Sequence, residues 1–303
     1  MSKMSAALRF WKSVGSRFLG ELAPRCGYRG CLQPRNRWRR MRGRSGSVRM
    51  QGMLYCSAAC LERALLEVLR AEHSGSKGTT LTPHRIPLGL ILLSRQQLTA
   101  DQLRCALEAQ RKVGSDVPTP KKIGEWLQDF GFATEQQVTA ALARQWSCPV
   151  LRNLPASMAA SFPLPIPTLL LEHFQVMPVE LVEATGSLLM AFGGSIDYSI
   201  LYAIERMLGY HTQPCLVRPS ILRKSLLAIA QHHGVNDVVF DCLQDIAECA
   251  HIIGNYTSTV RAEEVRLARC GEHLWIRLER LPREAVTLVL RVPRSYSLAA
   301  AQI

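Results

Sequence analysis

Four cysteines near the start of the chain have the residue type and spacing of a metal site. Cys26 and Cys31 are separated by four residues, and Cys56 and Cys60 by three. Two thiolate pairs at such spacings can share one zinc ion, which in structural sites has four protein ligands. The second pair is predicted at a helix start, where backbone N–H groups favour thiolates. We therefore predict a structural zinc site at these cysteines; the alternative is two pairs of ordinary buried or free thiols.

The remaining six cysteines occur singly along the chain. We interpret them as packing residues, because a free cysteine behaves as a small hydrophobic side chain. The first 20 residues lack the apolar core and the cleavage site of a secretory signal. Reduced thiols or a bound metal are therefore expected instead of a disulfide framework. The expected location is the cytoplasm, with peripheral association at the inner membrane as a variant of it.

The basic character of the chain is concentrated at its N-terminal end. Of the formal net charge of +13, residues 1–77 carry +12, from sixteen Lys and Arg against four Glu. Residues 1–20 predict a basic amphipathic helix for an anionic membrane surface or, alternatively, a partly frayed terminal helix. Seven arginines around Trp38 can bind nucleic-acid phosphates, the alternative being a solvated basic loop of the metal module. These arginines are Arg35, Arg37, Arg39, Arg40, Arg42, Arg44 and Arg49.

The middle of the chain repeats itself with a shift of 35 residues. Residues 88–110 and 123–145 share seven identities in 23 aligned positions, and each copy predicts a short helix, a turn and a longer helix. Both copies contain a Thr-x-x-Gln capping box, which defines where the longer helix begins. Two copies of one helical hairpin are expected to pack as a four-helix unit. The capping boxes are Thr99 with Gln102 and Thr134 with Gln137.

The predicted fold class is α+β, with four segments. Residues 1–77 contain the basic helix and a zinc-finger-like module with four cysteines, and residues 82–148 contain the tandem hairpins. Residues 149–234 alternate short apolar runs with helices, which indicates a small α/β unit. Residues 235–303 predict a helix to about residue 253 and then three strands, whose apolar face needs a cover. The strands are expected at 264–268, 274–278 and 286–292.

The sequence contains no recognisable catalytic arrangement. A phosphate-binding loop needs Gly-Lys-Ser or Gly-Lys-Thr at the start of a helix, and the chain has no Gly-Lys pair. No Ser-His-Asp set or pair of carboxylates stands out either. We therefore predict a protein that is not an enzyme.

Residues 85–233 resemble the N-terminal domain, in its MshEN form, of the type II secretion and type IV pilus assembly ATPases of the GspE/PilB family. The resemblance rests on the paired Leu-Gly and Ile-Gly hairpins that close with glutamine. It also rests on Gln-Trp-Ser-Cys-Pro-Val at 145–150 and His-Phe-Gln-Val-Met-Pro-Val at 173–179. Residues 262–267 and 274–278 look like the first strands of the PAS-like subdomain that precedes the motor in those ATPases.

The resemblance implies that the hairpins bind cyclic di-GMP, the ligand of MshEN domains. In that family each motif opens with Arg-Leu-Gly, whereas Pro87 and Lys122 stand at the arginine positions here. Arg85 is the nearest substitute for the first arginine, and Gln96 replaces a mid-motif glycine that the second copy keeps as Gly131. The residues expected to bind the ligand are Arg85, Leu88, Gly89, Leu92, Gln110, Lys122, Ile123, Gly124, Leu127 and Gln145.

The function that the resemblance implies is a non-enzymatic regulator or adaptor of a bacterial type II secretion or type IV pilus system. Such a protein would dock on a platform or ATPase protein and bind cyclic di-GMP, with zinc as its structural metal. The alternative function is a zinc-finger regulator that binds nucleic acid through the basic residues 1–77. The same basic module is also a candidate for contact with an anionic membrane surface.

Overall fold

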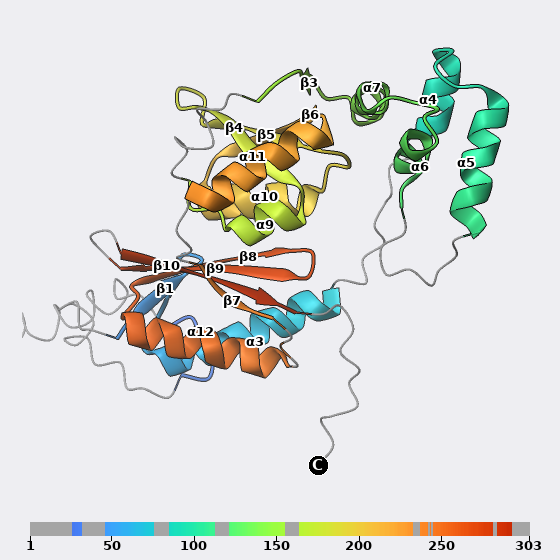
Figure 1. Cartoon of the computed structure of the whole chain (residues 1–303). Helices are drawn as coiled ribbons and strands as arrows, with labels where there is room; N and C mark the ends of the chain where they lie inside the picture. Colours follow the sequence, from blue (N-terminus) through green and yellow to red (C-terminus); the bar gives the residue numbers. More distant parts are fainter. Residues whose placement is uncertain are drawn as a thin grey trace, which may run out of the picture. The chain divides into compact units, whose positions relative to one another are not determined.

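The computed structural model of the chain describes residues 26–31, 46–75, 85–112, 121–154, 164–232, 237–241, 243, 245–280 and 284–292 (Figure 1). The chain divides into two compact units. Unit 1 combines Met1–Gly78 with Asn236–Ile303, and unit 2 is Thr79–Val235. The helix predicted at 1–20 and the arginines from Arg35 to Arg44 lie outside the described residues. Among the described helices, none combines the length and apolar character needed to cross a membrane.

Unit 1 is a six-stranded sheet in the order β2-β1-β8-β9-β10-β7. Two helices, α3 and α12, pack against each other, and Figure 1 shows both on the same face of the sheet. Strands β8, β9 and β10 are antiparallel neighbours, whereas β1 runs parallel to β8 and β7 runs parallel to β10. The elements are β1 (Val48–Met50), β2 (Met53–Tyr55), α3 (Ala58–Gly75), β7 (Asp237–Phe240), α12 (Ile246–Val260), β8 (Glu264–Cys270), β9 (His273–Arg280) and β10 (Glu284–Arg291).

The two ends of the chain, predicted as separate segments, contribute to one sheet and one core. Strands β1 and β2 form a hairpin whose two turn residues, Gln51 and Gly52, both have positive φ angles, of 51° and 78°. This is the conformation of a two-residue turn that matches the twist of the strands. The three strands predicted near the C-terminus are present. The helix expected at the start of that segment begins only at Ile246, because residues 237–240 form β7 against β10.

The first half of unit 2 consists of four helices that form the two predicted hairpins. They are α4 (Leu88–Ser94), α5 (Ala100–Lys112), α6 (Ile123–Asp129) and α7 (Glu135–Trp146). Both predicted capping boxes are confirmed: Thr99 N donates to Gln102 Oε1 at 2.9 Å, and Thr134 N donates to Gln137 Oε1 at 2.8 Å. The return bonds, from each glutamine N–H to the threonine Oγ1, measure 3.3 and 3.2 Å. Helix α4 packs on α7 and α5 packs on α6, so the hairpins pack across each other.

The second half of unit 2 is a four-stranded sheet in the order β3-β6-β5-β4. Strands β4 and β5 contain the short apolar runs of this segment, and β5 pairs with β6 in parallel across the crossover helix α10. A bidentate contact ties the hairpins to this half, since both carboxylate oxygens of Glu135 accept hydrogen bonds of 2.7 Å from Ser220. The elements are β3 (Val150–Leu151), α9 (Thr168–His173), β4 (Val176–Val182), β5 (Ser187–Phe192), α10 (Tyr198–Leu208), β6 (His211–Val217) and α11 (Pro219–His232).

Candidate functional site

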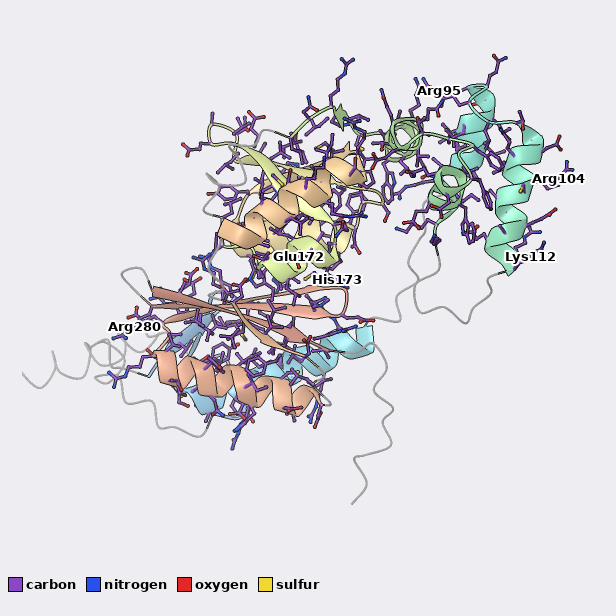
Figure 2. All side chains as sticks on the ribbon, viewed as in Figure 1. Arg95, Arg104, Lys112, Glu172, His173 and Arg280 are labelled. Atoms are coloured by element: carbon purple, nitrogen blue, oxygen red, sulfur yellow. The ribbon has the colours of Figure 1, made fainter. Side chains whose placement is uncertain are left out.

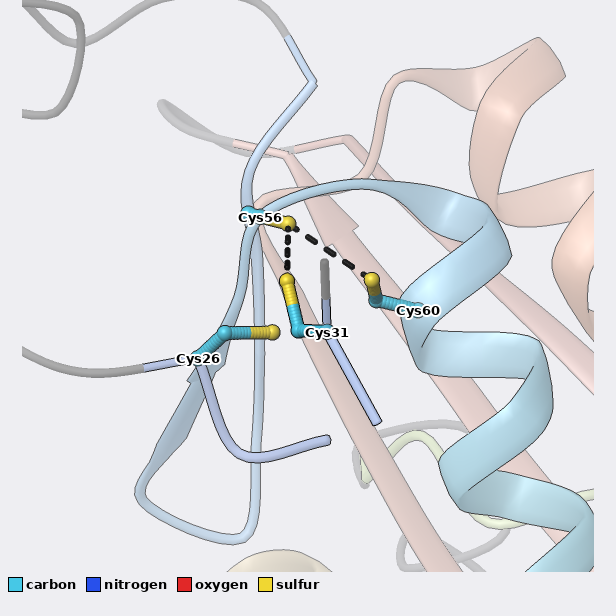
Figure 3. A group of neighbouring side chains, drawn as sticks. All are labelled: Cys26, Cys31, Cys56 and Cys60. Carbon is cyan, nitrogen blue, oxygen red and sulfur yellow. Dashed lines mark hydrogen bonds between the residues drawn. The ribbon is translucent and has the colours of Figure 1, made fainter. Parts of the chain in front are cut away.

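The four N-terminal cysteines meet at one point in unit 1 (Figure 3). The sulfur atoms of Cys26, Cys31, Cys56 and Cys60 all lie within 4.8 Å of one another. Cys56 Sγ is 3.6 Å from both Cys31 Sγ and Cys60 Sγ. Four thiolates at Zn–S distances of about 2.3 Å in a tetrahedron have their sulfurs about 3.8 Å apart. All four cysteines are free thiols, and their separations suit a shared metal ion.

A bridge to β2, a turn, the end of β2 and the start of α3 position these four side chains. Cys26 forms an isolated parallel bridge with Leu54, and the next N–H, of Gly27, donates to Leu54 O at 2.8 Å. The chain then turns, with Cys31 N donating to Tyr28 O at 3.2 Å. Cys56 directly follows β2, and Cys60 lies in the first turn of α3. Ser57 caps that helix: its Oγ accepts the N–H of Cys60 at 3.3 Å.

The pKa values of Cys56 and Cys60 show which form these thiols take without a metal. Burial, together with hydrogen bonds of the protonated Cys56 thiol to the sulfurs of Cys31 and Cys60, raises the pKa of Cys56 to about 12. Burial also raises the pKa of Cys60. Protonated thiols are therefore the stable form of Cys56 and Cys60 at neutral pH when no cation is bound, and a divalent ion would reverse this by stabilising thiolates. An all-sulfur donor set selects a soft or borderline metal such as zinc over magnesium or calcium.

In the hairpin unit, the glutamines that close the two motifs make reciprocal contacts. Gln110 Nε2 donates to the carbonyl oxygen of Lys121 at 3.0 Å, and Gln145 Nε2 donates to that of Ile86 at 2.7 Å. Each donor and each acceptor is related to its counterpart by the same shift of 35 residues. The end of each hairpin thus fixes the residue just before the start of the other. The helical unit has pseudo-two-fold symmetry in these contacts.

The motif glycines are required by close packing of helices. A Cβ atom on Gly89 would lie 2.7 Å from Leu103 Cδ1, and one on Gly124 would lie 2.9 Å from Val138 Cγ1. These two contacts are again related by the shift of 35 residues. A Cβ atom on Gly124 would also lie 3.2 Å from Leu88 Cδ2. The openings of the two motifs therefore touch each other.

The ten residues expected to bind the ligand fall into two groups. Five are buried in the helical unit, where they pack, and five are at least partly accessible. Among the accessible ones, Lys122 is exposed and its Nζ donates to Ser195 Oγ, in the loop before α10, at 2.7 Å. The buried group is Leu88, Gly89, Leu92, Gly124 and Leu127; the accessible group is Arg85, Gln110, Lys122, Ile123 and Gln145.

Arg85 lies at one end of a row of three aromatic rings, of which it contacts the first. Its guanidinium carbon lies 3.3 Å from the centre of the Trp146 ring, the distance of a stacked cation–π contact. The Trp146 ring is followed by Tyr198 at 6.1 Å and then by Tyr202 at 6.3 Å, between ring centres. Tyr198 and Tyr202 are 40% and 65% exposed. The position of Trp146 directly after the closing Gln145 was the one signal in the sequence that pointed to this residue.

Comparison with known proteins gives a partial match. No family model matches the chain. A stretch of 146 residues, 48% of this chain, is 25% identical to the type IV pilus assembly ATPase PilB of Thermus thermophilus. This comparison supports a domain of the GspE/PilB N-terminal type. The chain spans only 15% of the length of PilB.

Solved structures with related names are also similar to parts of the chain. A structure of MshE with cdg matches 49% of this chain and 100% of its own, with a TM-score of 0.39 and 20% identity. The N-terminal domain of XpsE matches 46% of this chain and 92% of its own, with a TM-score of 0.35 and 15% identity.

Proposed function

We propose that the protein is a regulator or adaptor of a type II secretion or type IV pilus system that binds cyclic di-GMP through its paired hairpins. The observation that carries the proposal is the reciprocal pair of glutamine contacts, which relates the two motif openings by pseudo-two-fold symmetry. The similarity to a pilus assembly ATPase supports the choice of system. The absence of enzymatic activity stays a prediction.

The symmetry of the hairpin unit suits a ligand made of two equal halves. Cyclic di-GMP contains two guanines and two phosphates, related by a two-fold axis. The two motif openings touch at Leu88 and Gly124, and each carries a cation close to its start, Arg85 in the first and Lys122 in the second. A cation at each opening suits a ligand that carries two negative charges.

The two cations would act differently. Arg85 has one planar face on Trp146, so its other face is suited to stack on a guanine. Lys122 is a compact charge without a plane, held by Ser195, and it suits a phosphate oxygen. We therefore assign base stacking to the first opening and phosphate binding to the second.

A calorimetric titration of the full chain with cyclic di-GMP tests the ligand. We expect saturable binding that weakens by about tenfold in Lys122→Met, the loss of one charge-assisted contact. Arg95→Met is the matched control: Arg95 is an exposed cation at the opposite end of α4 from the motif opening, and Figure 2 labels it on the outside of the hairpins. Absence of heat and of thermal stabilisation with excess ligand would remove cyclic di-GMP from the proposal.

The partner is proposed to be a platform or motor protein of the same secretion or pilus system. Co-purification of the full chain with each such protein of its host, with and without cyclic di-GMP, tests this. Binding to one of them is expected. Failure to bind any of them, for a chain shown to be folded, would contradict the adaptor function while leaving ligand binding intact.

We also propose that the four cysteines bind one zinc ion. The sulfur-only donor set, the separations of 3.6 Å and the position of two ligands at the start of α3 support it. Metal analysis of the purified chain should find about one zinc per chain, and Cys56→Ser should lose it. The exposed Cys105 offers the matched control, Cys105→Ser. A metal-free protein from zinc-replete cells would contradict this centre.

Three further expectations from the sequence remain predictions. Nucleic-acid or anionic-membrane binding by residues 1–77 depends on arginines that lie mostly outside the described residues. The PAS-like character of residues 235–303 and the cytoplasmic location are likewise predictions. Salt-dependent binding of the full chain to generic duplex DNA, lost in Cys56→Ser, would favour the nucleic-acid function over the adaptor function.

A further inference from the structure

We infer that zinc binding at the four cysteines and folding of the C-terminal sheet are one coupled equilibrium, so that the metal closes a domain built from both ends of the chain. The inference rests on the proposed zinc centre and goes beyond it. A self-contained zinc module, as the sequence suggests, would fold independently of the residues after 235.

The cysteine cluster lies at the β2 edge of the sheet. Cys26 bridges to β2, the edge strand, and Cys56 follows that strand directly. The hairpin of β1 and β2 joins the C-terminal strands through β1 and β8, which pair Arg49 with Glu264 and Met50 with Val265. This parallel ladder is short, with one further hydrogen bond from Arg49 N to Glu263 O at 2.8 Å. By itself it attaches the hairpin only weakly to the C-terminal strands.

The two ends of the chain share one hydrophobic core. The N-terminal segment and the C-terminal segment both supply side chains to this core. Neither segment buries its apolar side chains without the other. Without the N-terminal side chains, the apolar face of β8, β9 and β10 would lose the contacts that α3 and β1 provide. The N-terminal members include Val48, Met50, Leu61, Leu65 and Leu69, and the C-terminal members include Cys249, Ile253, Val265, Ile276 and Leu288.

Helices α3 and α12 are in close contact. Gly254 of α12 faces Glu62 of α3, and a Cβ atom there would lie 3.1 Å from Glu62 Oε2. The same carboxylate contacts His251 Nδ1 at 3.1 Å. Cys60 lies only two residues before Glu62, in the first turn of α3. A metal bond at Cys60 therefore acts directly on the helix that covers the C-terminal sheet.

The two N-terminal cysteines lie on a part of the chain with few backbone contacts to the sheet. Among the described residues, Cys26 and Gly27 contact Leu54 of β2 through one bridge and one hydrogen bond, and Cys26 and Tyr28 pack against the shared core. A metal ion that is bound only by the folded state stabilises the whole cooperative unit that holds its ligands. Coupling is reciprocal, so a defect in the C-terminal part of the core must weaken zinc binding at the N-terminal cysteines.

Hydrogen exchange of the full chain, measured with zinc and after chelation, tests the coupling. On chelation we expect protection in β8 and α12 to fall by about tenfold or more, and to return when zinc is added back. Protection in α4 to α7 of unit 2 is expected to stay unchanged and serves as the internal control.

A reciprocal measurement does not depend on any cysteine variant folding. Leu288→Ala, in β10, removes a fully buried side chain of the shared core and changes none of the four cysteines. We expect it to lower the affinity for zinc by about tenfold or more. Leu170→Ala, at a fully buried position of unit 2, should leave zinc affinity unchanged.

The outcomes separate the two proposals. If zinc binds, but neither chelation changes exchange in β8 nor Leu288→Ala changes zinc affinity, the coupling is wrong and the zinc centre stands as a local module. If the wild-type chain binds no zinc, both proposals are wrong.

Discussion

The side-chain amide of Gln145, at the end of the second hairpin, donates a 2.7 Å hydrogen bond to the carbonyl oxygen of Ile86, just before the first. Gln110 makes the equivalent contact with Lys121 at 3.0 Å. The two hairpins therefore hold each other's starting points. Recurrence of glutamine at a spacing of 35 residues has a structural cause, whether or not a ligand is bound.

Loss of either glutamine contact should destabilise unit 2. We expect Gln145→Met and Gln110→Met each to lower the free energy of unfolding by about 1 kcal/mol, because a backbone carbonyl loses its donor. Denaturant titration measures the change. Gln136→Met, at an exposed position of the same helix as Gln145, is the control and should change stability by less than about 0.5 kcal/mol. Equal effects of Gln136→Met and Gln145→Met would argue against the reciprocal contacts.

The two turn positions related by the repeat make a second test. Gln96 has a φ angle of 55° and its counterpart Gly131 has 67°, so both copies keep the left-handed turn although only one has glycine. Gln96→Gly should therefore stabilise the protein by about 1 kcal/mol, and Gly131→Gln should destabilise it by a similar amount. A shift of the melting temperature in the same direction for both variants would contradict this.

The helix-packing glycines predict a larger effect. Gly89→Ala and Gly124→Ala place a methyl group 2.7 Å and 2.9 Å from Leu103 and Val138, which should cost about 1–3 kcal/mol. Gly194→Ala is the control, since its Cβ would meet open space. Val138→Ala combined with Gly124→Ala should recover part of the loss in a double-mutant cycle. A fully additive cycle would show that the methyl group does not clash with Val138.

Local patterns were sufficient to predict much of unit 2. The capping boxes fix the starts of α5 and α7, and the short apolar runs in β4 and β5 are bounded by glycine and proline, so these strands are visible in the sequence. Strands β1 and β7 were missed, because each is only three or four residues long and exists through pairing with a strand distant in sequence. The shared domain was missed for the same reason.

The candidate sites were predictable to different degrees. The presence of four cysteines in two closely spaced pairs was enough to group these thiols, because cysteine is the only residue type that supplies a thiolate ligand to a metal. In the hairpins, Leu92, Leu127 and the two motif glycines recur for packing, so recurrence alone could not distinguish core residues from ligand contacts. The contact between Lys122 and Ser195 joins residues 73 positions apart and left no sequence signal.

The stacked pair of Arg85 and Trp146 predicts a graded response to substitution. Trp146→Phe keeps an aromatic face for Arg85 and should bind cyclic di-GMP with nearly wild-type affinity, whereas Trp146→Leu should bind about tenfold more weakly. Arg85→Lys should resemble Trp146→Leu, because lysine has no planar face. Calorimetry gives the affinities, and equal binding by the Phe and Leu variants would show that stacking on Trp146 has no part in it.

Unit 2 should lose stability at alkaline pH through a buried thiol. Burial raises the pKa of Cys215 to about 12, above the ordinary value of 9.0. Between these values the thiol ionises in the unfolded chain but stays protonated in the folded one, so stability that is present below pH 9.0 is lost as the pH rises towards 12. The slope is at most about 1.4 kcal/mol per pH unit.

Unfolding of Cys215→Ala in urea at about pH 9 and about pH 11 measures this contribution. The variant should lose less stability over this interval than the wild type does. Cys105→Ala, at an exposed position, should follow the wild type. Parallel losses in all three proteins would contradict a protonated Cys215 in the folded state.

The central claim is that the two motif openings form one site, and hydrogen exchange with and without cyclic di-GMP tests it most directly. Saturating ligand should protect the amides of residues 85–92 and 121–127 together, at one common ligand concentration. Protection confined to one opening, or no protection in either, would contradict a paired site.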